Sequence, residues 1–151
     1  MVRYRYACGV VCRRHGWRDR AAGWFRGVLD QDAGHGPARL ELVWLHLEAG
    51  SLPEARRLLA QRPADGERRG ADLPDWQWRR LEAVLLLAED RPVDALKAYP
   101  ARDEASLPPE VWWREFLHLA RVAAPRDPAT VLARLEGLDA APPTAADRVT
   151  F

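Results

Sequence analysis

The stretch Leu40–Ala60, LELVWLHLEAGSLPEARRLLA, decides the fold. In its first half, Leu40, Val43 and Leu47 recur at the spacing of one helix face. Gly50 then ends this pattern, because glycine readily takes the backbone conformation that closes a helix. The first half therefore predicts a short amphipathic helix that stops at Gly50.

The second half of the stretch begins a new helix. Ser51 and Glu54 have the S-x-x-E spacing of a capping box, and Pro53 falls in the first turn, where its missing N–H costs nothing. Leu58 continues the apolar stripe, and Ala55 provides the small side chain expected where two helices press closest. The stretch predicts a helical hairpin with an uncovered apolar face, which needs neighbours of the same kind.

The same punctuation recurs along the chain. Each hairpin has a turn position followed five residues later by an alanine, at intervals of 34, 40 and 34 residues between successive alanines. The turn position is held by Gly16, Gly50, Asp90 and Ala124, and the alanine position by Ala21, Ala55, Ala95 and Ala129.

A period of 34 residues with helix–turn–helix units resembles the tetratricopeptide repeat family over nearly the whole chain. The fourth unit departs most from the family pattern, because Ala133 stands where a large residue is expected and Leu117 where a small one is. The resemblance implies an all-α, right-handed α-solenoid of three to four helix-turn-helix repeats, and the alternative is an irregular helical bundle.

The predicted repeat domain covers residues 1–139. Its units are residues 2–35, 36–69, 76–109 and 110–139, and Gln61–Leu73 reads as a polar loop. Residues 140–151 form a Pro/Ala-rich tail.

Composition places the chain among soluble proteins. Apolar residues make up 48% and charged residues 30% of the 151 positions, and the longest apolar run, Ala83–Ala88, is too short to cross a bilayer. A secretory signal is not visible, because Arg13 and Arg14 follow directly on the apolar patch Ala7–Cys12. The expected compartment is the cytoplasm.

Charge is unevenly distributed. Residues 1–30 hold seven arginines and two aspartates, a net charge of +5, whereas the remainder has a net charge of −4. A basic end can favour an acidic partner or RNA, although a solvated helical face explains it as well. The first unit begins at Val2 with nothing before it to cover its outer face, so association through this N-terminal repeat is a further expectation.

The resemblance also implies where a partner would bind, because the first helices of stacked units line the concave face. The groove positions combine apolar anchors with arginines that can bind carboxylates bidentately. The expected partner-binding residues are Tyr6, Arg13, Arg14, Trp44, Leu47, Arg80, Val84, Arg114, His118 and Arg121.

Catalytic and metal chemistry find little support. Cys8 and Cys12 lie four residues apart, too far for a disulfide within one helix, and we interpret them as reduced packing residues. Together with His15 they could supply three metal ligands, but a structural zinc site wants four, so no metal or cofactor is expected. Ser51 reads as a helix cap, and His46 as a satisfied core histidine.

The sequence therefore predicts a non-catalytic interaction or scaffold module that captures a protein or peptide segment, acidic and with apolar anchors. Two alternatives stay open: a nucleic-acid-associated protein that uses the Arg-rich N-terminal repeat, and an accessory subunit of an enzyme complex.

Overall fold

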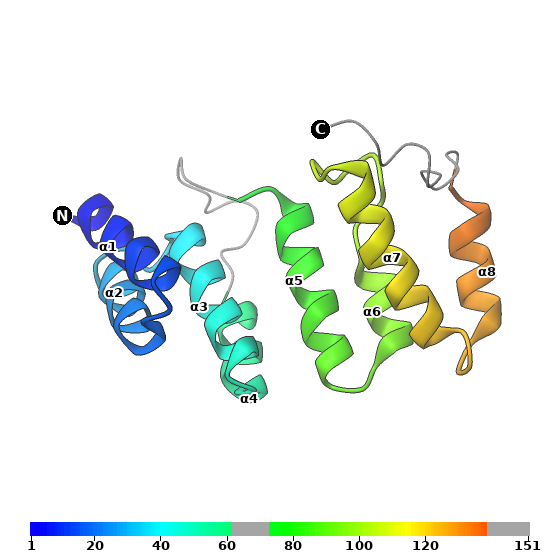
Figure 1. The fold of residues 1–151 in the computed structure, drawn as a ribbon, viewed down its shortest axis with the longest axis horizontal. Coiled ribbons are helices and arrows are strands. Elements are labelled where there is room, and N and C mark those ends of the chain that lie inside the picture. The colour runs from blue at the N-terminus through cyan, green and yellow to red at the C-terminus, as the bar shows by residue number, and fades with distance from the viewer. Residues whose placement is uncertain (62–72, 139–151) are drawn as a thin grey trace. The chain divides into compact units, whose positions relative to one another are not determined.

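The computed structural model describes residues 1–61 and 73–138, and this part of the chain is helical without a strand (Figure 1). Its helices are α1 (Val2–Arg14), α2 (Arg18–Gln31), α3 (Gly36–Glu48), α4 (Leu52–Ala60), α5 (Asp75–Ala88), α6 (Pro92–Ala98), α7 (Pro109–Ala123) and α8 (Pro128–Glu136). The predicted all-α fold class is confirmed. Most of the predicted loop Gln61–Leu73 and the whole predicted tail 140–151 lie outside the described residues, and the domain bounds 1–139 stay a prediction.

The chain divides into two compact units, Met1–Leu81 and Glu82–Phe151, and we describe each by itself. In the first unit, α1 packs against α2, α2 against α3, and α3 against α4. Ala21, Phe25, Val43 and Ala55 are completely buried between these helices. Gly9 of α1 faces the ring of Phe25 so closely that a Cβ atom there would lie 2.5 Å from Cε1. The two predicted alanine positions of this unit are therefore helix contact points.

The turns of the first unit repeat one hydrogen-bond pattern. Gly16 and Gly50 have φ values of 74° and 73°, the left-handed conformation that glycine adopts without steric cost. The N–H of Trp17, which follows Gly16, donates to the Cys12 carbonyl at 2.9 Å. The N–H of Ser51, which follows Gly50, donates to the His46 carbonyl at 2.8 Å. Each bond joins the residue after the glycine to the carbonyl five residues earlier, and this bond closes the helix end in a Schellman motif.

The capping box predicted for α4 is wrong. Ser51 is the N-cap residue but makes no side-chain cap bond, and Glu54 instead accepts hydrogen bonds from Arg57. Glu54 and Arg57 are i,i+3 neighbours on the surface of α4. The carboxylate of Glu54 therefore pairs with the guanidinium of Arg57 and does not accept from the N–H of Ser51. The proline placement is confirmed, because Pro53 lies in the first turn.

The second unit repeats the same turn once. Asp90, between α5 and α6, has a φ of 61°, and the N–H of Arg91 donates to the Leu86 carbonyl at 2.9 Å. Ala95, five residues after Asp90, is completely buried. Tyr99 and Pro100 follow the last residue of α6 and end the helix. The third predicted hairpin therefore turns as the first two do, with aspartate replacing glycine.

The predicted register of the fourth hairpin is wrong. Ala124 has right-handed helical dihedrals, and Ala129 is exposed. The N-cap residue of α8 is Asp127, whose carboxylate accepts a hydrogen bond from the Thr130 N–H, so the fourth helical position falls on Val131. In the other three hairpins this position is the buried alanine, and here Val131 is the buried residue of α8. The turn is two residues longer than the spacing of the alanines suggests.

An aromatic cluster forms the core of the second unit. Trp112 stacks on Phe116 at 4.7 Å between ring centroids, and Trp113 meets both rings edge-on. The indole N–H of Trp112 donates to the Pro100 carbonyl at 3.1 Å, which ties α7 to the end of α6. These tryptophans are therefore packing residues.

Candidate functional site

The predicted partner-binding residues of the first unit differ in the contacts that their side chains make with other residues of the chain. Tyr6 is half-buried, and its ring lies 5.8 Å from the ring of Phe25 and 5.2 Å from that of His35. Because these contacts hold the ring against α2 and the start of α3, Tyr6 is packed within the hairpins rather than presented to a partner.

Arg13 is occupied by acidic residues of the neighbouring helix. Its guanidinium pairs with Glu41, and also with Glu48 at 3.3 Å, so it joins α1 to α3. We therefore revise the predicted role of Arg13 as a carboxylate receptor, because two carboxylates of the chain already satisfy it. Arg14 is exposed and makes no ion pair with the described residues.

Trp44 and Arg80 lie together. The guanidinium of Arg80 lies 5.9 Å from the centroid of the Trp44 ring, a cation–π contact between α3 and α5. Trp44 and Leu47 are half-buried, so each keeps part of its apolar surface in contact with solvent. The structure thus brings together one predicted anchor and one predicted cation.

In the second unit, α7 presents a row of exposed side chains. Arg114, His118 and Arg121 are all exposed and share one face at i, i+4 and i+7. Leu117, which the sequence analysis did not place in the site, is 44% exposed on the same face. Neither arginine has a partner among the described residues. Val84 is half-buried on α5 and is not part of this row.

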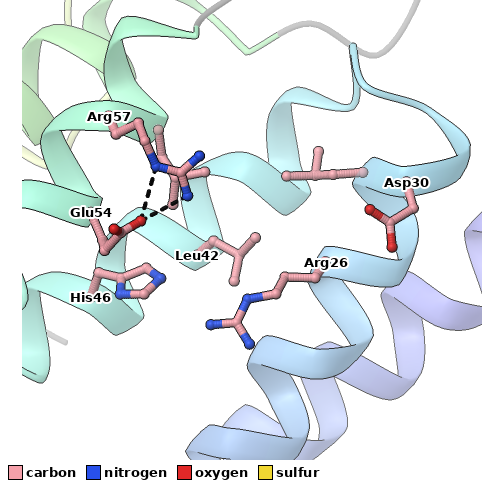
Figure 2. Close-up of a pocket in the computed structure, with 8 residues that line it drawn as sticks. Arg26, Asp30, Leu42, His46, Glu54 and Arg57 are labelled. Carbon is pink, nitrogen blue, oxygen red and sulfur yellow. Dashed lines mark hydrogen bonds and ion pairs between the residues drawn. The ribbon is translucent and has the colours of Figure 1, made fainter.

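A pocket of about 360 Å³ lies between α2, α3 and α4, and the sequence analysis missed it (Figure 2). Leucine side chains meet charged ones around it. Its lining comprises Arg26, Leu29, Asp30, Leu42, His46, Glu54, Arg57 and Leu58. On its α4 side, Glu54 accepts hydrogen bonds from Arg57 Nε at 3.0 Å and Nη2 at 2.7 Å.

His46 is half-buried at this pocket and its imidazole makes no hydrogen bond to the described residues, so its interpretation as a satisfied core histidine is wrong. Burial, followed by the positive charge of Arg26, lowers the pKa of His46 below its ordinary value of 6.5, while the carboxylate of Glu54 acts in the opposite direction. The imidazole is therefore neutral at neutral pH. A signal for the pocket was present in the sequence, because Leu42 and His46 share a helix face at i and i+4.

The pocket lining offers little catalytic chemistry. It holds two arginines, one glutamate and one aspartate beside the neutral His46, so its formal charges cancel, and it contains no hydroxyl or thiol nucleophile. Within residues 1–61 and 73–138, no three histidine, cysteine, aspartate or glutamate side chains gather as metal ligands. Cys8 and Cys12 are unpaired, the first half-buried and the second buried. Among the described helices, none combines the length and the apolar character needed to span a bilayer.

Comparison with known proteins identifies the repeat. Residues 18–85 match the family model of the tetratricopeptide repeat, a span that runs from the start of α2 into α5. No curated protein and no solved structure matches the chain. The matched span contains the turn at Gly50 and the buried alanines Ala21 and Ala55. Residues 18–85 are therefore similar in sequence to the tetratricopeptide repeat, over somewhat less than half of the chain.

Proposed function

We propose that this chain is a non-catalytic interaction module that binds a protein segment carrying carboxylates and an apolar side chain. Tetratricopeptide repeats generally serve protein–protein interaction or scaffolding, and the family is generally non-catalytic. The exposed row of side chains on α7 is the observation that supports a partner with carboxylates and an apolar side chain.

The row on α7 has the composition expected of a receptor for such a segment. Arg114 and Arg121 are exposed cations without partners in the described chain, and Leu117 offers apolar surface between them. A guanidinium that no carboxylate of the chain satisfies can donate two parallel hydrogen bonds to a carboxylate of another molecule. By contrast, the guanidinium of Arg13 already pairs with two carboxylates of the chain, those of Glu41 and Glu48.

The spacing of the two arginines specifies the partner further. Seven residues of α-helix advance about 10.5 Å along the axis. In an extended polyproline II segment, with three residues per turn and a rise of about 3.1 Å per residue, carboxylates at i and i+3 lie on one face about 9 Å apart. An extended segment with acidic residues at i and i+3 therefore fits Arg114 and Arg121, and a leucine between the two acidic residues falls at the level of Leu117.

The predicted positions in the first unit offer a more apolar contact surface, which we consider separately from the row on α7. Trp44 and Leu47 keep apolar surface in contact with solvent, and Arg80 lies beside the Trp44 ring. As a separate contact on the first unit alone, we assign Trp44 and Leu47 to apolar anchoring of a partner and Arg80 to orienting it there, and we assign no carboxylate contact to Arg13.

Fluorescence anisotropy tests the proposal with a dye-labelled peptide that carries glutamates three residues apart and one leucine between them. The double charge reversal Arg114→Glu with Arg121→Glu should weaken binding at least about tenfold, which corresponds to about 1.4 kcal/mol. A matched control, Arg20→Glu with Arg26→Glu, changes the net charge equally on exposed positions of α2 and should bind as the unaltered protein does. Circular dichroism checks that both variants remain helical.

Two outcomes would overturn the proposal. Equal loss of binding in the control variant would mean that total charge, and not the α7 row, attracts the peptide. The nucleic-acid alternative would be favoured if the protein bound single-stranded RNA, if this binding weakened more steeply with added salt than peptide binding does, and if the α2 control variant lost it. Against that alternative, Arg5 donates to the Gly27 carbonyl, and both Arg13 and Arg18 pair with Glu48, so much of the N-terminal arginine content is already in use.

A further inference from the structure

The outer face of α1 is an apolar stripe that stays exposed. Tyr4 is 68% exposed and Val11 51% exposed, and Ala7 between them is exposed as well. Their spacing of i, i+3 and i+7 places them on one line along the helix, opposite the buried Gly9 and Cys12. Large apolar side chains lined up in this way mark an interaction surface more often than single exposed ones do.

Positive charge borders this stripe. Arg3 and Arg14 are exposed and share the face of Ala7, and neither has a partner within residues 1–61 and 73–138. α1 contains no acidic residue. The face therefore suits an apolar surface that carries negative charge.

The outer face of α8 has the matching properties. Leu132 is 57% exposed and Leu135 37% exposed, and Ala129 and Ala133 are exposed beside them. Glu136 is exposed next to Leu132 on this face and has no partner among the described residues. The opposite face of α8 is used within the unit, because Val131 is buried and Arg134 donates to the Tyr99 carbonyl at 2.9 Å.

No described residue covers these faces of α1 and α8. Each face belongs to a type of helix that packs on the other type within the chain. In the first unit α2, the second helix of its hairpin, packs on α3, the first helix of the next. In the second unit α6 packs on α7 in the same relation. α8 is a second helix and α1 a first helix, so α8 of one molecule can pack on α1 of another as α2 packs on α3.

We propose that two copies of this chain associate head to tail, with the outer face of α8 of one molecule packed on the outer face of α1 of the next. Leu132 and Leu135 contact the stripe of Tyr4, Ala7 and Val11. Glu136 faces the border formed by Arg3 and Arg14. A symmetric contact of two α1 faces is disfavoured, because it brings these arginines against arginines. The interface is heterologous, so each molecule retains one free face of each kind until a ring closes.

Analytical ultracentrifugation over a series of concentrations tests the association in the full chain. A head-blocked variant carries Tyr4→Glu and Val11→Glu, and a tail-blocked variant carries Leu132→Glu and Leu135→Glu, because a charge in either stripe would have to be buried unpaired. The unaltered chain should gain mass with concentration, and each variant alone should remain monomeric. An equimolar mixture of the two variants should form a dimer and nothing larger, because it contains one intact face of each kind.

Leu117→Glu is the matched control, because it places the same charge on an exposed leucine outside both faces and should associate as the unaltered chain does. Three results would overturn the proposal: an unaltered chain that remains monomeric at all concentrations, a variant that associates by itself, or a mixture that remains monomeric. The second result would point to a symmetric dimer.

Alkylation of Cys8 gives a second readout at the interface. Cys8 is half-buried beside Tyr4 on α1, whereas Cys12 is buried. In the mixture of variants, Cys8 of the tail-blocked molecule should react more slowly with N-ethylmaleimide, and Cys8 of the head-blocked molecule should react at its unchanged rate. Mass spectrometry distinguishes the two, and equal rates in both molecules would contradict the proposed arrangement.

Discussion

Arg126 holds Asp90 through two hydrogen bonds, one to its backbone carbonyl at 2.8 Å and one to its carboxylate at 2.7 Å. Asp90 lies in the turn between α5 and α6, and Arg126 in the turn before α8. The contact therefore links two turns of the second unit across 36 residues. It also engages a residue whose backbone is in the left-handed region, where side chains other than glycine are rare.

Replacement of Asp90 separates the backbone effect from the side-chain contact. Asp90→Ala and Asp90→Gly both remove the carboxylate, but only glycine adopts a φ of 61° without steric cost. We expect the glycine variant to be about 1 kcal/mol more stable than the alanine variant in urea unfolding. Equal stability of the two variants would show that this turn does not require a positive φ.

The buried alanines are predicted to reject larger side chains. Ala55 is completely buried between α3 and α4, so Ala55→Leu should lower the free energy of unfolding by about 1–3 kcal/mol. Ala129→Leu is the matched control, because Ala129 is exposed and its replacement should change stability by less than about 0.5 kcal/mol. Thermal unfolding measures both, and similar losses in the two variants would contradict the revised register of the fourth hairpin.

Two glycines inside helices should respond in opposite directions to alanine. Gly23 of α2 has open space around it, so Gly23→Ala should stabilise the protein by about 0.5–1 kcal/mol through helix propensity. At Gly9 the new methyl group would meet the buried Phe25 ring, and the resulting overpacking, about 1–3 kcal/mol, exceeds that gain. Chemical denaturation should therefore rank Gly23→Ala above the unaltered chain and Gly9→Ala below it.

His46 is predicted to make stability depend on pH. Its pKa is lower in the folded protein than the ordinary value of 6.5, so between these two values the unfolded chain binds a proton that the folded chain does not. Stability is therefore lost as pH falls below 6.5, and this loss is complete below the folded pKa. Denaturation at a series of pH values should show a smaller loss over this range for His46→Gln than for the unaltered chain. An identical dependence in both would mean that His46 is not desolvated.

The surface row on α7 was largely predictable, whereas the contacts of the first unit were not. Arg114, His118 and Arg121 follow helical spacing, and their exposure needs no information from distant residues. The ion pairs of Arg13 depend on Glu41 and Glu48, which lie 28 and 35 residues later in the sequence. The local pattern of α1 does not reveal these partners. The pocket at His46 was missed for the same reason, since its lining comes from three helices.

By itself, the sequence determined the helices, the position of the left-handed turns and the spacing of the buried alanines in three hairpins. These depend on local chemistry: apolar side chains every three to four residues, a residue that tolerates positive φ, and a small side chain at the fourth helical position. Tertiary structure alone decided the register of the fourth hairpin, the pairing of Arg13 and the exposure of α1 and α8. In each case the free energy depends on which distant side chain is close enough to bury or neutralise a group, and a one-dimensional pattern does not contain that distance.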